Sequence, residues 1–318
     1  RYQGFYQLGI ISDIVPDRDH VSHIWFGFLG IIRGIIILKH LKYKNTPMKK
    51  TATKQGTRRS LGISAFPIII LCFILAMVIY HFVYGNPANF INNDPNNHPI
   101  QGNLLGTIYK GGIIVPVIQT LLFTVLTLSV ERLIALKRAK GKKNLQQFVT
   151  KVKSDLEEGN IEAVRQACDE QKGTVANVIK ASLSTYSQVS VCDTLSKEEK
   201  QLAVRKDLEE ATMLELPTME QNLGVIATIT TLGTLMGLLG TVIGMIKSFA
   251  ALSSAGGTDS IALSTGISEA LVNTAFGIAT GACAVIAYNF FTSKIDGITH
   301  SIDEIGAYLV QSFTIKQR

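Results

Sequence analysis

Four long runs of the chain contain no Asp, Glu, Lys or Arg: residues 66–84, 111–130, 222–246 and 270–293. A helix of about 20 apolar residues is long enough to cross the roughly 30 Å hydrocarbon core of a bilayer. A buried helix of this length and purity would be unusual in a soluble protein. The pattern therefore predicts an all-α polytopic membrane protein, whose long transmembrane helices extend into a cytoplasmic helical domain.

The segment between the second and third runs has a different pattern. Residues 137–222 mix both charge signs with apolar positions three and four residues apart, which is typical of helices with one solvated face. Ser196 and Glu199 have the spacing of a capping box at a helix start. The last span is expected to continue into the cytoplasm as an amphipathic helix, because the same spacing recurs at Ile295, Ile298, Ile302, Ile305, Leu309 and Phe313.

Lysine and arginine are distributed unevenly around these runs. Residues 49–59 contain five basic residues and no acidic one, residues 132–143 contain six basic residues, and the connector 85–110 contains a single lysine. Basic residues concentrate on the cytoplasmic side of membrane proteins. The N-terminus of the core and residues 132–222 are therefore expected in the cytoplasm. The net charge of +7 is an orientation signal and does not indicate nucleic-acid binding.

The beginning of the chain fits less well, because it contains no methionine before Met48 and Arg33 interrupts a short apolar run. We expect an upstream-encoded or non-native extension there, with a membrane-inserted or interfacial helix as the alternative. The predicted divisions are this extension at 1–47, an extra N-terminal transmembrane helix with its outward loop at 48–110, a further transmembrane helix at 111–136, a cytoplasmic helical domain at 137–221, a pair of pore-lining transmembrane helices at 222–293 and a cytoplasmic C-terminal helix at 294–318.

The chain contains no recognisable catalytic or metal-binding motif. Its four cysteines lack the spacing of metal ligands, its six histidines are scattered, and neither a phosphate-binding loop nor a nucleophile motif is present. We therefore expect no enzyme activity, no metal and no cofactor.

The third run contains more glycine than an ordinary apolar helix tolerates, since each costs roughly 1 kcal/mol relative to alanine. On a helical wheel of about 100° per residue, its threonines and glycines form one small-residue face opposite a bulky one. Such faces allow close helix packing in membranes, and the threonines could simply bond back to their own helix. The residues concerned are Gly233, Gly237, Gly240 and Gly244, with Thr230, Thr234 and Thr241 beside them.

The fourth run has a similar stripe, which contains Thr274, Gly277 and Gly281. Glu269 and Asn273 enter this helix from its outer end, and a carboxylate there needs water or a partner. Two such helices could line a narrow, weakly polar lumen. No span carries an acid or base near its centre, so a titratable group on a proton path would have to come from another protein.

The motifs "TLMGLLGTVIGMIKSF" and "GISEALVNTAFGIATG" together resemble the ExbB/TolQ/MotA proton-channel family, and its ExbB branch most. The resemblance covers about residues 111–310. It departs from the family pattern in the extra span 66–84 and in Thr234, where a proline is common. By motif, Thr241 and Thr274 correspond to pore threonines, and Glu269 corresponds to an acid at the outer pore rim.

The resemblance implies a bacterial inner-membrane location and a homopentamer around an ExbD/TolR-like partner. The partner's single membrane helix would carry the proton-accepting aspartate. The implied function is a proton-channel subunit that energises outer-membrane transport through a TonB-like transducer. The alternatives are a TolQ-like envelope-maintenance motor, a flagellar or gliding stator, and a membrane scaffold that conducts no ions.

Overall fold

The computed structural model describes residues 64–95, 97–192, 194–254 and 260–315. Within these ranges the chain is α-helical, and its only β-type pairing is an isolated bridge between Phe90 and Pro99. The expectations for residues 1–47 and for the basic cluster at 49–59 lie outside the described residues.

Four helical segments of the described chain are long and apolar enough to cross a membrane, as the sequence predicted. They are Ala65–Tyr84, Ile114–Glu157, Leu223–Ala250 and Leu263–Ser312. The first consists of helix α2 (Ala65–Ile79) and a π-helical turn, η2 (Tyr80–Tyr84). Two short 3₁₀ turns, η3 (Pro87–Asn89) and η4 (Ile91–Asn93), and helix α3 (Leu104–Lys110) lead from it to α4 (Ile114–Lys140).

The polar middle of the chain forms helices α5 (Leu145–Glu157), α6 (Ile161–Gln171), α7 (Thr174–Val191) and α8 (Lys197–Glu220). Asparagine side chains cap the starts of α5 and α6 by accepting backbone N–H bonds. The predicted capping box is present, because Glu199 N donates to Ser196 Oγ and Ser196 N donates to Glu199 Oε2.

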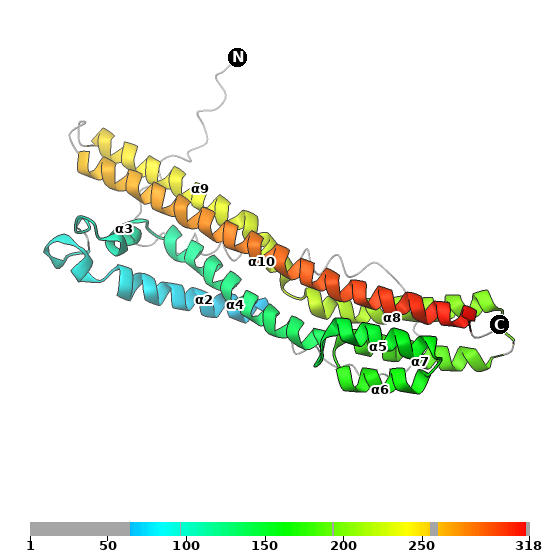
Figure 1. Cartoon of the computed structure of the whole chain (residues 1–318). Helices are drawn as coiled ribbons and strands as arrows, with labels where there is room; N and C mark the ends of the chain where they lie inside the picture. Colours follow the sequence, from blue (N-terminus) through cyan, green and yellow to red (C-terminus); the bar gives the residue numbers. More distant parts are fainter. Residues whose placement is uncertain (1–63, 96, 193, 255–259, 316–318) are drawn as a thin grey trace, which may run out of the picture. The chain divides into compact units, whose positions relative to one another are not determined.

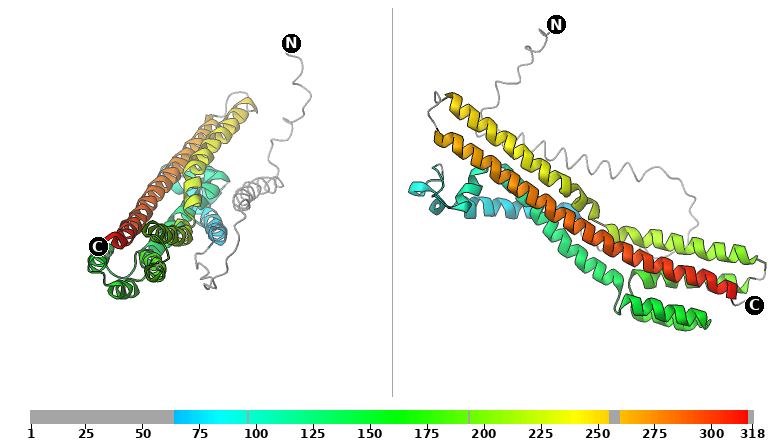
Figure 2. Two further views of the ribbon diagram at one scale, coloured as in Figure 1. Left: turned by 90° about the vertical axis from the view of Figure 1, so that its right-hand side faces the viewer. Right: turned by 45° about the horizontal axis from the view of Figure 1, so that its top comes forward.

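Helices α9 (Leu223–Ser254) and α10 (Ser260–Ile315) lie side by side (Figure 1, Figure 2). Helix α10 is one unbroken helix of 56 residues that continues beyond α9 and packs against α5, α7 and α8. The apolar positions expected on its far half are buried there, with Ile302, Ile305 and Leu309 fully enclosed. The side chain of Phe313 lies outside the described residues.

A buried arginine joins α4 to the break between α8 and α9. Arg132 is 1% exposed, and its Nη1 donates to the carbonyl oxygens of Thr218 and Met219, each at 3.2 Å. It also pairs with Glu131. Asn222, at the break, has a φ of 63°. Because the last carbonyls of a helix have no partner within it, this guanidinium completes the end of α8.

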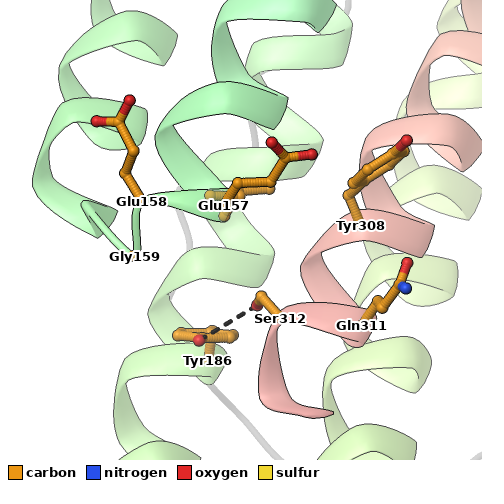
Figure 3. A pocket seen from close by; sticks show the side chains of 8 residues that line it. Glu157, Glu158, Gly159, Tyr186, Tyr308, Gln311 and Ser312 are labelled. Carbon is orange, nitrogen blue, oxygen red and sulfur yellow. Dashed lines mark hydrogen bonds between the residues drawn. The ribbon is translucent and has the colours of Figure 1, made fainter. Parts of the chain in front are cut away.

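A small cavity lies near the C-terminal end of α10 (Figure 3). Its volume is about 190 Å³, and its walls come from the α5–α6 turn, α7 and α10. Figure 3 shows the hydroxyl of Ser312 on α10 directed at Tyr186 on α7, and the two oxygens are 3.3 Å apart. This cavity is separate from the glycine-rich part of α9 and α10.

Candidate functional site

The glycine stripes of α9 and α10 face each other, and the two helices touch through their backbones. A methyl group added to Gly277 would lie 2.6 Å from Cα of Gly237. One added to Gly233 would lie 3.1 Å from the backbone nitrogen of Gly281. Real side chains do not fit at distances below about 3 Å, so the helices would have to move apart to accept a side chain at Gly277, whereas at Gly233 the fit would be tight.

Towards the C-terminal end of α9 the glycines make room for larger groups on α10. A methyl group on Gly240 would overlap Asn273, at 2.3 Å from its Cβ, and one on Gly244 would lie 2.9 Å from Cβ of Ala270. From sequence, the stripe was expected to allow close packing of helices. In the structure all four glycines of α9 contact α10 of the same chain.

The threonine hydroxyls donate to backbone carbonyls. On α9, Thr230 Oγ1 donates to Ala227 O at 2.6 Å, Thr234 Oγ1 to Thr231 O at 2.8 Å and Thr241 Oγ1 to Leu238 O at 2.5 Å. Such bonds engage the hydroxyl proton and leave the oxygen lone pairs able to accept. Thr234 is exposed on the helix pair, and Thr230 and Thr241 are half-buried.

Thr274 is the threonine that links the two helices. Its Oγ1 lies 3.1 Å from Ala270 O on its own helix and 3.4 Å from Gly237 O on α9. It is half-buried, so part of its side chain still reaches the surface of the pair. Sequence reasoning overlooked Thr280, which is fully buried and whose methyl group packs beside Gly233.

An ion pair connects the C-terminal part of α9 to the N-terminal part of α10. Lys247 Nζ lies 2.8 Å from Glu269 Oε1, and the glutamate side chain is 9% exposed. Gly112, before α4, packs against the same carboxylate oxygen with a φ of 69°. The partner that a carboxylate needs at this depth is therefore a lysine of the same chain. Sequence reasoning used Lys247 only as the last basic residue before the connector to the fourth span and missed this role.

Asn273 lies inside the protomer. It is 1% exposed, and its Nδ2 donates to Gly111 O at 3.0 Å. This amide joins α10 to the turn before α4. The same side chain also lies beside Gly240 of α9, so it is buried on both sides. The arrangement thus divides the predicted site residues into two sets. The threonines lie on or near the surface of the helix pair, whereas Asn273 and Glu269 are enclosed within the chain.

Comparisons with known proteins identify the same region. Residues 170–304 match the model of the MotA/TolQ/ExbB proton channel family. Over 91 residues the chain is 37% identical to a biopolymer transport protein named ExbB-like 3 from Synechocystis sp., which covers 28% of this chain and 43% of that protein.

Two further relatives carry the names of different branches. Biopolymer transport protein ExbB of Pseudomonas putida is 29% identical over 140 residues, which are 44% of this chain and 42% of that protein. Tol-Pal system protein TolQ of Haemophilus influenzae is 32% identical over 104 residues, which are 33% and 44% of the two chains. The chain thus spans less than half the length of each of these three relatives. Together with the match to the family model across α9 and most of α10, they show that this part of the chain is similar to members of the MotA/TolQ/ExbB proton channel family, ExbB proteins among them.

Proposed function

We propose that the protein is the channel-forming subunit of an ExbB-type motor in a bacterial inner membrane. In this role several copies, five by analogy with the family, surround an ExbD-like partner. Protons that enter through the complex drive motion of that partner, and a TonB-like protein passes the energy to outer-membrane transport. The observation that carries the proposal is the glycine-to-glycine contact of α9 and α10 within the segment that matches the family.

The composition of the spans explains why a partner is needed. The runs 222–246 and 270–293 contain no acid or base, so these helices cannot themselves hold a proton at mid-membrane. Their half-buried threonines offer hydroxyl oxygens that can accept a hydrogen bond. We assign Thr241 and Thr274 to the proton path, with Thr230 and Thr234 farther along it towards the cytoplasm. The aspartate of the partner helix is the group that takes up and releases the proton.

The energy available fits this scheme. One elementary charge that crosses 100 mV releases about 2.3 kcal/mol. The backbone contact between Gly237 and Gly277 leaves no side chain between the two helices, which favours their acting as one unit. The energy of proton transfer would therefore appear as movement of the partner inside the ring and not as deformation of α9 and α10.

A TolQ-like role in envelope maintenance is the second candidate, and the matches to TolQ proteins of Haemophilus influenzae and Pseudomonas aeruginosa favour it specifically. The two roles differ in the transducer and not in the proposed proton path.

The test is reconstitution of the full chain in liposomes with an ExbD-like or a TolR-like single-span protein. Proton uptake should require the partner, and it should vanish when the partner aspartate is changed to asparagine. Co-purification from cells with a TonB-like or a TolA-like protein would distinguish the two roles. Flux from the chain alone, or from the aspartate variant, would refute the proposal.

A further inference from the structure

The segment between α2 and α4 has a defined fold that is held by its own hydrogen bonds. The buried Asn89 amide donates to Val83 O at 2.9 Å and to Tyr84 O at 3.1 Å. Asn103 donates to Asn89 Oδ1, and its own Oδ1 accepts from the backbone at the start of α3. Phe90, 1% exposed, forms the centre of this fold. The Asn-rich composition therefore gives a defined structure in place of a flexible connector.

This segment contacts the N-terminal part of α10 at three positions. His98 Nδ1 lies 3.0 Å from Thr265 Oγ1. One to two turns further along α10, Glu269 packs against Gly112, and Asn273 bonds to Gly111 O. Any force that acts on the segment is thus transmitted to α10.

The surface of the segment is more apolar than a water-exposed loop requires. Leu104, at the start of α3, has a relative exposure of 75%, as does Phe82 at the end of the first span. Large contiguous apolar surfaces on a protein indicate contact with a membrane or another protein. The other exposed apolar side chains of this region are Val83, Ile91, Ile100, Leu105 and Ile113.

This apolar surface follows directly on the exposed face of α2. That face belongs to a candidate membrane span and consists of Phe66, Ile70, Leu71, Ile74, Leu75 and Val78. Phe82 and Val83 therefore continue the apolar surface of the candidate span up to the start of this segment.

Charge and aromatic residues also suit the boundary of a membrane. Residues 85–113 contain two charged side chains, Asp94 and Lys110. Lys110 Nζ donates to Pro95 O at 2.9 Å and lies 5.5 Å from the ring centre of Phe90. Burial lowers the pKa of Lys110, although Asp94 opposes this. Tyr80 stacks on Tyr109 here, and tyrosine is enriched at membrane–water interfaces.

We infer that the segment 85–113 lies in the headgroup layer of the outer leaflet and anchors α10 to it. The exposed leucines of α3 enter the lipid, while the asparagine-rich turns remain in water. Through His98 and Asn273 this interfacial anchor holds the outer end of a helix that the proposed function assigns to the proton path. The inference concerns the position of the loop and would stand if the transported ion or the transducer were different.

Spin-label accessibility tests the anchor. In the full-length chain with its native cysteines replaced by alanine, Leu104→Cys carries a nitroxide in liposomes, and Gln101→Cys, exposed and polar just before α3, is the matched control. At Leu104 we expect collisions with oxygen, which dissolves in lipid, to exceed those with a water-soluble nickel chelate. At Gln101 the order should be reversed.

Two results at Leu104 would overturn the inference. Predominant collision with the nickel chelate would place the leucine in water. Protection from both reagents would mean that protein, such as a neighbouring copy, covers it. A second measurement guards against disturbance by the label. In a chain whose native Trp25 is changed to phenylalanine, the fluorescence of Leu104→Trp should be quenched by lipids brominated near the headgroup, and an unquenched tryptophan would contradict the anchor.

Discussion

Lys247 and Glu269 form an ion pair of 2.8 Å between α9 and α10, in which the carboxylate is enclosed and the lysine is 52% exposed. Lys247→Met should therefore lower thermal stability, because it leaves a charge unpaired in a poorly hydrated place. We expect less than the roughly 3–5 kcal/mol that follows loss of one partner in a fully buried pair. The measurement is the Tm of the purified protein in detergent.

The matched control removes both charges. Lys247→Met with Glu269→Gln should recover most of the lost stability, because no unpaired charge remains. Equal Tm values for the wild type and Lys247→Met would show that solvent already screens the pair and that it does not hold the helices together.

The glycine contact can be tested with two single methyl groups on the same helix. Gly277→Ala places its methyl 2.6 Å from Gly237 Cα and should destabilise the protein or prevent assembly. Gly297 also lies on α10, but nothing approaches its added methyl within 4 Å. Gly297→Ala should therefore stabilise the protein by up to about 1 kcal/mol through helix propensity alone. Thermal unfolding and native mass spectrometry measure both effects, and a harmless Gly277→Ala would contradict the backbone contact.

Native cysteines provide a test of topology and burial. Burial raises the pKa of the Cys168 thiol to about 12, so almost no reactive thiolate exists at pH 7.5 and its modification should be slow. Thiolate increases as the pH rises towards this pKa, so the rate should rise through alkaline pH. Cys192 is exposed in the polar region expected in the cytoplasm. An impermeant maleimide should label it in inside-out vesicles and not in intact cells.

Two introduced cysteines provide controls for sidedness. Asn92→Cys should react from outside in intact cells, and Lys153→Cys should not. Labelling of Cys192 or Lys153→Cys from outside would contradict the proposed orientation.

Features that depend on the local pattern were predictable from sequence, whereas those that depend on tertiary pairing were not. Charge-free runs indicated the four candidate spans, and the residue spacing at Ser196 and Glu199 indicated the capping box. Arg132 was counted only as an orientation signal, because its contacts at Thr218 and Met219 are more than 80 residues away. The glycine stripe of α9 likewise indicated that another helix packs closely against α9, but not which one. Only the structure shows that Gly237 packs against Gly277 of α10.

The threonines decide between a proton path and a scaffold. Thr241→Val and Thr274→Val are close to isosteric, so packing of the helix pair should survive. Their hydroxyls donate to backbone carbonyls, and if this is their whole role the double variant changes stability slightly and proton uptake continues. If they line the path, uptake with the partner present should fall sharply while the complex still assembles. Glu269→Gln should have a weaker effect in the same assay.

A third threonine on α9 provides the control for this experiment. Thr228 Oγ1 donates to Gly224 O at 2.8 Å, which is the same type of bond, but Thr228 is exposed and outside the assigned row. Thr228→Val should therefore leave proton uptake unchanged. If loss of a back-bonding hydroxyl were harmful in itself, Thr228→Val would impair uptake as much as Thr241→Val does. Normal uptake by an assembled Thr241→Val/Thr274→Val complex would refute the path and favour the scaffold.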